Sequence, residues 1–199
     1  MSIRLRMRTR SEEMARSDSR QRMLGAAVTL IQRQGYHATG MKQVVEESGT
    51  PRGSLYFHFP DGKDQMIGEA LGIAKDAVAG TIDRVAGRSE SPAEFIEGLG
   101  AAMAKWLTRS EFVEGCPVAT VALEVAPLHE TLTPASEQAF THWIDQIAGH
   151  LVTLGMTSAE ADEVAVSSMA ALEGGMILAR VRQDAAPLKT AMARLAATV

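Results

Sequence analysis

The chain has 199 residues, of which 46% are hydrophobic, 22% are charged and 5% are aromatic. This balance is typical of a globular protein, and the low aromatic content with abundant Ala, Leu, Val and Met favours helices over a β-sandwich. The net charge of −4 hides an asymmetry, because residues 1–63 hold 11 Lys/Arg against 6 Asp/Glu and the remaining 136 residues hold 9 against 18. These counts predict a basic module that meets a polyanion and an acidic module with another role.

Composition also argues against several classes of protein and site. We find no apolar run of 18 residues and no hydrophobic signal core at the start, so we expect a cytoplasmic protein with no membrane partner. A single cysteine, Cys116, excludes an intramolecular disulfide and a cysteine-cluster metal site. His142 and His150 are eight residues apart, which is poor spacing for a metal site. We expect neither a metal nor a cofactor.

Residues 1–17 are expected to form a flexible basic arm ahead of the first helix. In this segment Arg4, Arg6, Arg8 and Arg10 alternate with small or apolar residues. One interpretation is a solvated tail, as chain termini often are. The other is an arginine arm that lies on phosphates or in a narrow minor groove.

Residues 18–62 are expected to form three helices. The first runs from Asp18 or Ser19 to Gly35, Thr39 can cap a second that ends at Gly49, and Thr50 followed by Pro51 predicts a third as far as about His58. The first of these carries an apolar stripe at helical spacing. That stripe consists of Leu24, Ala27, Val28 and Ile31.

From Lys63 onwards the pattern changes to longer helices with short breaks. Two capping boxes mark helix starts, one from Ser91 to Glu94 and one from Thr157 to Glu160. Glycine or proline marks most of the breaks. The expected helices cover residues 63–86, 92 to just before 115, 117–126, 133–154, 158–182 and a last segment from about 187. The whole is an all-α fold of about nine helices.

The segment from Thr50 to Phe59 meets the requirements of the second helix of a helix-turn-helix. That helix must anchor one face on its neighbours and expose small or polar side chains to the major groove. Leu55 and Phe59, one turn apart, can face inward, and Gly53 permits close approach to DNA. The remaining surfaces then carry Arg52, Ser54, Tyr56 and His58.

Three runs of residues, together with Lys63, carry a resemblance to a known family. They are Gly35-Tyr36-His37-Ala38-Thr39, Val44-Val45-Glu46-Glu47-Ser48-Gly49 and Arg52-Gly53-Ser54-Leu55-Tyr56-Phe57-His58-Phe59. This part of the chain, roughly residues 18–65, resembles the amino-terminal domain of the TetR family of bacterial repressors. Residues 53–63, with Gly115-Cys116-Pro117-Val118-Ala119, further resemble the LmrA/YxaF-like branch of that family.

The resemblance implies a DNA-binding domain of residues 18–62 and a ligand-binding and dimerisation domain of residues 63–199. It implies a homodimer that binds a palindromic double-stranded operator, with a small hydrophobic or aromatic molecule as inducer. Thr39 and Thr50 would cap helices against phosphates. The DNA-binding set that we predict is Thr39, Thr50, Pro51, Arg52, Gly53, Ser54, Tyr56, His58 and Lys63.

The predicted DNA-binding residues have different tasks. Tyr56, His58 and Lys63 would hold the phosphate backbone of the DNA. Arg52 would read guanine with help from Ser54. The alternative for Tyr56 and His58 is simple helix packing, and for Lys63 it is a solvated lysine. Where the family usually has two adjacent hydroxyl residues, Gly40 follows Thr39, so one phosphate contact is expected to be missing.

The carboxy-terminal helices supply candidates for a ligand pocket and for a dimer interface. Large apolar or polarizable side chains at helical spacing suit a pocket for flat ligands, although such stripes more often form core. The candidate pocket residues are Met103, Trp106, Phe112, Cys116, Phe140, Trp143, Met169, Glu173 and Met176. Small residues and the apolar face of the last helix suggest a dimer interface of Ala171, Gly174, Gly175, Leu188, Met192 and Leu195.

Glu173 stands out because it lies in an otherwise apolar helix, where a buried carboxylate needs a partner. That partner would be a ligand hydroxyl or cation, or a residue such as Arg180 across a dimer interface, unless Glu173 lies on an exposed polar stripe. Two other functions stay open: a constitutive DNA binder without an inducer, and a small helical enzyme that uses Cys116 with His129 or Glu124. We expect no enzyme activity.

Overall fold

The computed structural model describes the backbone of residues 10–199 and the side chains of residues 17–51 and 53–199. In this part of the chain the regular elements are nine α-helices and one 3₁₀ turn, which confirms the all-α prediction. The elements are α1 (Arg10–Ala38), α2 (Met41–Ser48), the 3₁₀ turn η1 (Arg52–Ser54), α3 (Leu55–His58), α4 (Lys63–Ala86), α5 (Pro92–Arg109), α6 (Pro117–Val125), α7 (Leu132–Thr153), α8 (Ser158–Arg182) and α9 (Ala186–Ala196).

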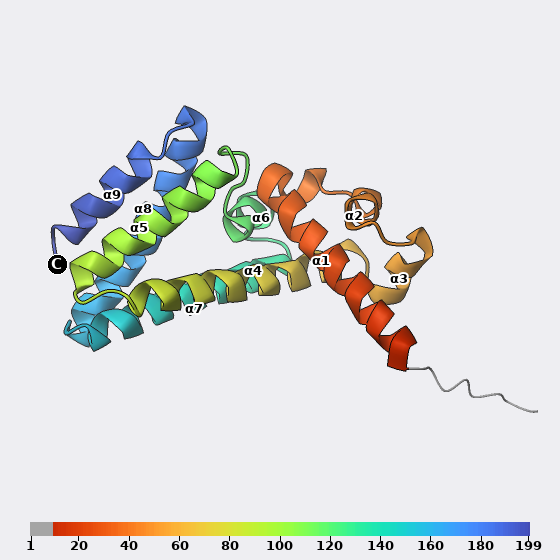
Figure 1. Ribbon diagram of the computed structural model, residues 1–199, viewed down its shortest axis with the longest axis horizontal. Helices are drawn as coiled ribbons and strands as arrows, with labels where there is room; N and C mark the ends of the chain where they lie inside the picture. Colours follow the sequence, from red (N-terminus) through yellow and green to blue (C-terminus); the bar gives the residue numbers. More distant parts are fainter. Residues whose placement is uncertain (1–9) are drawn as a thin grey trace, which may run out of the picture.

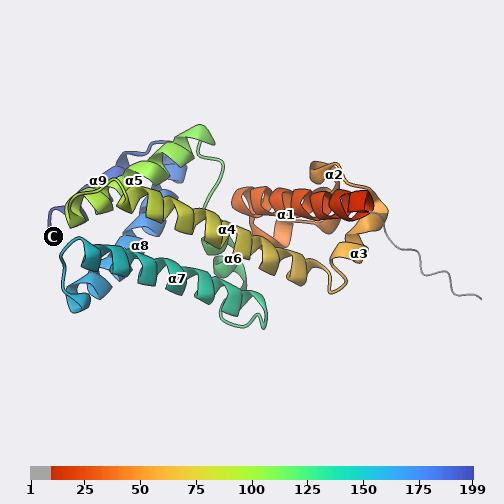
Figure 2. The ribbon, with the colours of Figure 1, turned by 60° about the horizontal axis from the view of Figure 1, so that its bottom comes forward.

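The helices form an elongated molecule with two distinct ends. Helices α1, α2 and α3 lie at one end, and α5, α8 and α9 lie at the other (Figure 1). Helices α4 and α7 run side by side between the two ends, while α6 packs against α1 and α7 (Figure 2). The first residues of α4 therefore lie beside the small amino-terminal domain, and its last turns belong to the larger domain.

Helix α4 is fastened to α7 by side chains that bond across the pair. Trp143 Nε1 donates to the Lys75 carbonyl at 3.0 Å, and His150 Nε2 lies 2.8 Å from Asp83 Oδ1. Hydrogen bonds from His150 and Gln146 hold the pKa of Asp83 below its usual value. These bonds make α4 and α7 one unit along most of their length.

Helix α1 begins at Arg10, eight residues before the expected start at Asp18. Residues 11–22 contain neither Gly nor Pro, so nothing in the sequence stops the helix from extending backwards. Asp18 is a mid-helix residue that pairs with Arg22 at 3.3 Å rather than a cap. The prediction for the basic arm at residues 1–9 lies outside the described residues.

Gly35 interrupts α1 at the position where the sequence predicts its end. Its backbone adopts φ 78° and ψ −173°, after which one more turn follows to Ala38. A Cβ at Gly35 would lie 1.7 Å from Glu124 Oε1, and Glu124 Oε2 accepts a hydrogen bond from His37 N at 2.7 Å. Glycine is required here because the backbone has positive φ and the carboxylate from α6 occupies the space of a side chain.

Two of the predicted helix caps, Ser91 and Thr157, are confirmed, whereas α7 differs in its start. Ser91 accepts from Glu94 N, and Thr157 and Glu160 form a complete capping box. Helix α7 begins at Leu132 instead of after Thr133. The reason is His129, whose Nδ1 accepts from the backbone N–H of Thr131 at 3.3 Å and of Leu132 at 3.2 Å.

Helix α9 packs on α5 and α8 within the same chain, at two glycines. A Cβ on Gly175 would lie 2.8 Å from Leu188 Cδ1, and a Cβ on Gly100 would lie 2.7 Å from the Met192 side chain. Leu188 and Met192 are buried in the core. The prediction that Gly175, Leu188 and Met192 face a second subunit is therefore wrong. The two glycines admit α9 of the same chain, and Leu188 and Met192 pack against them.

Helix α8 is more apolar than the sequence analysis recognised. Among the described helices, α8 is the one whose length and composition would allow it to cross a membrane. Its mean hydropathy is 1.4 over 18 residues. In the fold it packs against α5, α7 and α9 and buries Ala165, Met169, Leu172 and Ala179. One side of α8 thus belongs to the core, whereas Val166, Ile177 and Val181 on another side are exposed.

Candidate functional site

The second helix of the helix-turn-helix is anchored from its inner face. Leu55 and Phe59 are buried, as their spacing predicts. The Arg20 guanidinium of α1 lies over the Phe59 ring, 5.2 Å from its centroid, and forms an ion pair with Glu69 of α4. The predicted helix from Pro51 to His58 is divided into the 3₁₀ turn η1 and the short helix α3.

The outward face of this segment presents aromatic and small residues. Tyr56 is 71% exposed, and Pro51 and Gly53 are exposed beside it. Phe57, which the sequence analysis did not select, is 55% exposed and meets the half-buried His58 ring edge-on at 5.2 Å. An exposed phenylalanine beside an exposed tyrosine is a feature that packing does not explain.

The two threonines predicted as helix caps are buried. Thr39 is fully buried and donates from Oγ1 to the Gly35 carbonyl at 2.6 Å, while Gly40 takes the cap position of α2 without a side-chain bond. Thr50 is also buried, and its Oγ1 lies 2.7 Å from Ser48 Oγ. The capping prediction is wrong for both because their hydroxyls bond inside the domain.

The polar residues next to η1 have defined roles in the fold. Ser54 Oγ donates to the Pro51 carbonyl at 2.6 Å and so closes the turn. The side chain of Arg52, the predicted reader of guanine, lies outside the described residues. Its backbone opens η1 next to the exposed Gly53.

Lys63 belongs to a cluster at the junction of the two domains. Its Nζ lies 4.1 Å from the centroid of the Tyr36 ring, and burial lowers the pKa of its amine. Tyr36 donates from its hydroxyl to Asp64 Oδ1 at 2.5 Å, and His129 Nε2 lies 3.6 Å from Asp64 Oδ2. Burial, together with the bond to Asp64, raises the pKa of Tyr36 to about 12. Lys63 is therefore a positioned, half-buried residue.

A cavity of about 980 Å³ lies in the larger domain. Residues of α1, α4, α5, α7 and α8 and the start of α6 form its walls, and Val28 and Gln32 are the contribution of α1. Of the candidate pocket residues, those that line it are Met103, Trp106, Cys116, Trp143, Met169, Glu173 and Met176.

Two of the candidate pocket residues lie outside the cavity lining. Phe140 packs against Trp143 with the rings edge to face at 5.6 Å. Phe112 sits in the turn after α5 with φ 61°, and its carbonyl accepts a hydrogen bond from Arg180 Nε at 3.3 Å. The prediction that these two side chains line the cavity is therefore wrong.

Glu173 and Cys116 form a polar pair in the cavity wall. Burial raises the pKa of Glu173 to about 7, and the bond that the Cys116 thiol makes to this carboxyl opposes the shift. Burial also holds the pKa of the Cys116 thiol well above its ordinary value. The partner of Glu173 within the chain is thus Cys116, and Arg180 bonds elsewhere.

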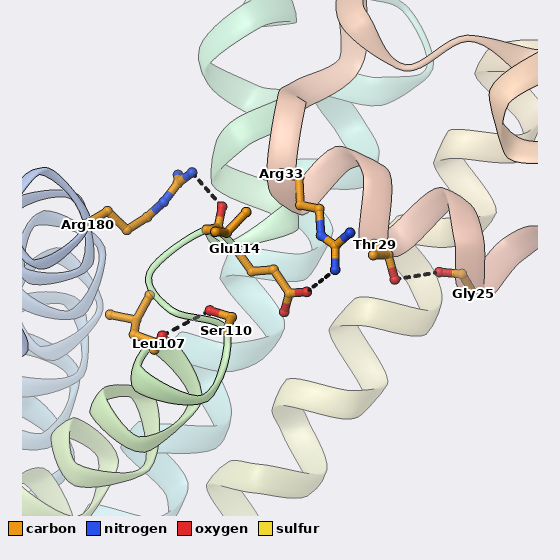
Figure 3. Close-up of polar contacts among 8 residues, drawn as sticks. Gly25, Thr29, Arg33, Leu107, Ser110, Glu114 and Arg180 are labelled. Atoms are coloured by element: carbon orange, nitrogen blue, oxygen red, sulfur yellow. Dashed lines mark hydrogen bonds and ion pairs between the residues drawn. The ribbon is translucent and has the colours of Figure 1, made fainter. Parts of the chain in front are cut away.

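The loop of residues 110–116, between α5 and α6, connects the cavity wall with α1 and α8. Arg180 of α8 donates to the Val113 carbonyl at 2.9 Å, and Glu114 pairs with Arg33 of α1 at 3.3 Å (Figure 3). The backbone of Gly115 donates to the Gln32 carbonyl at 2.8 Å. This loop is a second bridge to the amino-terminal domain, beside α4.

Comparison with known proteins agrees with this geometry. Residues 23–77 match the family described as bacterial regulatory proteins of the tetR family. Residues 92–194 match the carboxy-terminal domain of LmrA/YxaF-like transcriptional regulators. The chain belongs to the TetR family. Its larger domain is of the LmrA/YxaF-like type, as the sequence resemblance predicts.

Individual TetR-family proteins extend the match over most of the chain. The HTH-type transcriptional regulator LmrA of Bacillus subtilis is 34% identical over 88% of this chain and 93% of its own length. YxaF of the same organism is 35% identical over 87% of this chain and 91% of its own. A TetR regulator from Legionella pneumophila superimposes with a TM-score of 0.79 at 22% identity, over 98% of this chain and all of that one.

These relatives are transcription regulators. In the fold, Cys116, His129 and Glu124, the residues of the enzyme hypothesis, each contact different partners. The Cys116 thiol bonds Glu173, whereas His129 contacts Asp64 and caps α7. Glu124 accepts the bond from the His37 backbone. This TetR-family protein is a DNA-binding transcription regulator.

Proposed function

We propose that this protein represses transcription by binding a palindromic operator as a cytoplasmic homodimer, and that a small hydrophobic or aromatic inducer in the cavity releases it. The observation that carries the proposal is the course of α4. This helix begins at Lys63 beside the helix-turn-helix, and from Ile73 to Val85 one of its faces lines the cavity. A molecule in the cavity therefore touches the same rigid element that supports the DNA-binding end.

The DNA contacts divide into positioning and reading. Tyr56 and His58 would hold the phosphate backbone, and the exposed ring of Phe57 would extend this surface. Arg52 would read guanine O6 and N7 in the major groove, because a guanidinium can donate two parallel hydrogen bonds there. Lys63 acts from the domain junction, where the Tyr36 ring holds its amine. Buried Thr39 and Thr50 are left out of the contact set.

The dimer interface that the geometry supports is the exposed face of α8. An apolar stripe runs along this face at helical spacing, with Val166 55% and Val181 80% exposed. Gly174, exposed and with free space around it, permits close approach of another helix. The remaining members of the stripe are Ala170, Ile177 and Leu178. A second copy of this face would bury the stripe and set two reading heads about one DNA turn apart.

The switch is a difference in affinity between two arrangements of the dimer. The inducer would prefer an arrangement in which the reading heads are wrongly spaced for the operator. Two connections carry that preference: α4, and the loop of residues 110–116 that contacts α1. Val28 and Gln32 also place α1 itself in the cavity wall.

The test is fluorescence anisotropy of the full chain on duplexes from the DNA upstream of its own gene, at stated salt. We expect salt-dependent, sequence-selective binding that one class of aromatic compound relieves. Sequence-selective binding that a broad panel of compounds leaves unchanged would favour a constitutive regulator. A monomer by light scattering at the working concentration would contradict the dimer.

Arg52→Ala tests the reading role. We expect a loss of roughly 1 to 3 kcal/mol on the cognate duplex and a smaller loss on random duplexes. Arg194→Ala, which removes an exposed arginine of α9 at the other end of the molecule, is the matched control. Equal losses on both duplexes for Arg52→Ala would show that the residue does not read bases.

A further inference from the structure

Four cationic side chains line the cavity, and all four residues are exposed. Arg84 lies near the end of α4 and Arg88 follows it, while Lys105 and Arg109 lie in the last turns of α5. We call these four residues the cationic rim. They combine solvent exposure with contact to the cavity, as expected for residues at its opening.

The rim is unusual for the charge of the domain around it. Residues 64–199 hold 9 Lys/Arg against 18 Asp/Glu, yet four of those nine cations line one cavity. The acids in the lining are Glu94 and Glu173. Glu94 already accepts a hydrogen bond from the Glu90 backbone at 2.8 Å.

Within the described side chains, the rim residues are not neutralised by ion pairs. Arg84 donates to the Thr81 hydroxyl at 2.7 Å, which leaves its charge uncompensated. The four cations come in two pairs that are four residues apart in the sequence: Arg84 of α4 with Arg88 in the turn after it, and Lys105 with Arg109 in α5. Within a helix, like charges at this spacing are destabilising, which applies to Lys105 and Arg109 in α5. The α5 pair therefore opposes the stability of its own helix, and all four cations line the one cavity.

The interior of the cavity suits an apolar body. Trp106, Trp143 and Met176 are among its walls. The one acid in the α8 wall, Glu173, has its pKa raised to about 7 by burial, so part of the population is uncharged at neutral pH. A neutral carboxyl does not repel an anion, and a low-dielectric cleft with cations at its opening concentrates anions from solution.

We propose that the cavity binds amphipathic organic anions, with an aromatic or aliphatic body inside and a carboxylate, sulfonate or phosphate group at the cationic rim. This inference rests on the proposed function, because it names the class of inducer for the same cavity. It goes beyond a merely hydrophobic ligand by assigning Arg84, Arg88, Lys105 and Arg109 a role in selecting charge.

The test compares two dyes that share one aromatic body. 1-Anilinonaphthalene-8-sulfonate is an anion, and N-phenyl-1-naphthylamine is the same body without the sulfonate. The chain has two tryptophans, Trp106 and Trp143, and both line the cavity, so energy transfer from tryptophan reports binding at this place. Displacement of one dye by the other shows that they share the site.

The decisive variant is Arg88→Gln/Lys105→Gln in the full chain. We expect it to bind the sulfonate roughly tenfold more weakly and the neutral dye unchanged, since two partly solvated charge contacts are lost. Lys189→Gln/Arg194→Gln removes two exposed cations of α9 that do not line the cavity, and should leave both dyes unchanged. Added salt should weaken only the sulfonate.

Equal losses of both dyes, or no loss of the sulfonate, would overturn the selection of anions. If Lys189→Gln/Arg194→Gln weakens sulfonate binding as much, the loss reflects the net charge of the protein. That result would also overturn the selection of anions by the rim. The proposed function fails separately: if the sulfonate binds through the rim but leaves operator anisotropy unchanged, the ligand class stands and release by that ligand does not.

Discussion

Replacing Glu173 by glutamine should stabilise the protein, and only at the higher end of the pH range. The pKa of this carboxyl is raised from 4.5 to about 7 because burial disfavours its charged form. The folded protein therefore holds a proton that the unfolded chain releases between these two values. The free energy of unfolding must fall as the pH rises through this window, and stay level above it.

The magnitude follows from the size of the shift. One pKa unit corresponds to about 1.4 kcal/mol, so the charged Glu173 costs the folded state about 2 to 3 kcal/mol above about pH 8, given its partial exposure. Glutamine carries no charge at any pH and can still accept the hydrogen bond from Cys116. At about pH 8 the free energy of unfolding of Glu173→Gln should therefore be about 2 to 3 kcal/mol larger than that of the parent protein. At about pH 5 the two free energies of unfolding should be nearly the same.

Urea unfolding at several pH values, at one protein concentration, measures this difference. Glu163→Gln, an exposed glutamate on the same helix, is the matched control and should not stabilise the protein at high pH. A gain for Glu173→Gln that is equal at both ends of the pH range would refute the assignment to ionisation. Destabilisation at about pH 8 would show that the carboxylate has a charged partner.

Three further variants test other parts of the structure. Arg180→Ala removes the bonds that hold the loop of residues 110–116, so we expect ligand to bind as before but to change operator affinity less; unchanged release in anisotropy would contradict the coupling. Gly35→Ala places a methyl group against Glu124 at positive φ and should lower the free energy of unfolding in urea by about 1 to 3 kcal/mol. An unchanged free energy would show that the backbone at residue 35 adjusts without strain. Thr157→Ala removes the cap of α8 and should cost about 1 kcal/mol, whereas less than a few tenths would show that the cap is redundant.

Local signals in the sequence predicted the parts of the fold that depend on local physics. The break at Gly35, the capping box at Thr157 and the inward faces of Leu55 and Phe59 follow from backbone preference and side-chain period. The hydroxyl of Thr39 was assigned wrongly because it donates to the Gly35 carbonyl four residues back, the same bond that Thr29 and Thr81 make in their helices. The residue type allows either a cap or this bond, and the sequence does not say which one forms.

The errors in the larger domain have a common cause. Gly175 and Leu188 have the composition of a helix interface, but composition does not say whether the partner helix belongs to the same chain or to another. The cationic rim was missed for a related reason. The spacing of Arg84 with Arg88 is visible in the sequence, but only the packing of α4 beside α5 places these cations with those of the next helix.

The separation of charge along the molecule has a consequence for how it meets DNA. Residues 10–63 hold 8 Lys/Arg against 6 Asp/Glu and lie toward one end of the elongated body, whereas residues 64–199 hold 9 against 18, so the described part of the protein has an electric dipole along its long axis. Near a duplex this dipole exerts a torque that turns the helix-turn-helix toward the phosphates before contact. Productive collisions should thereby be enriched at low ionic strength.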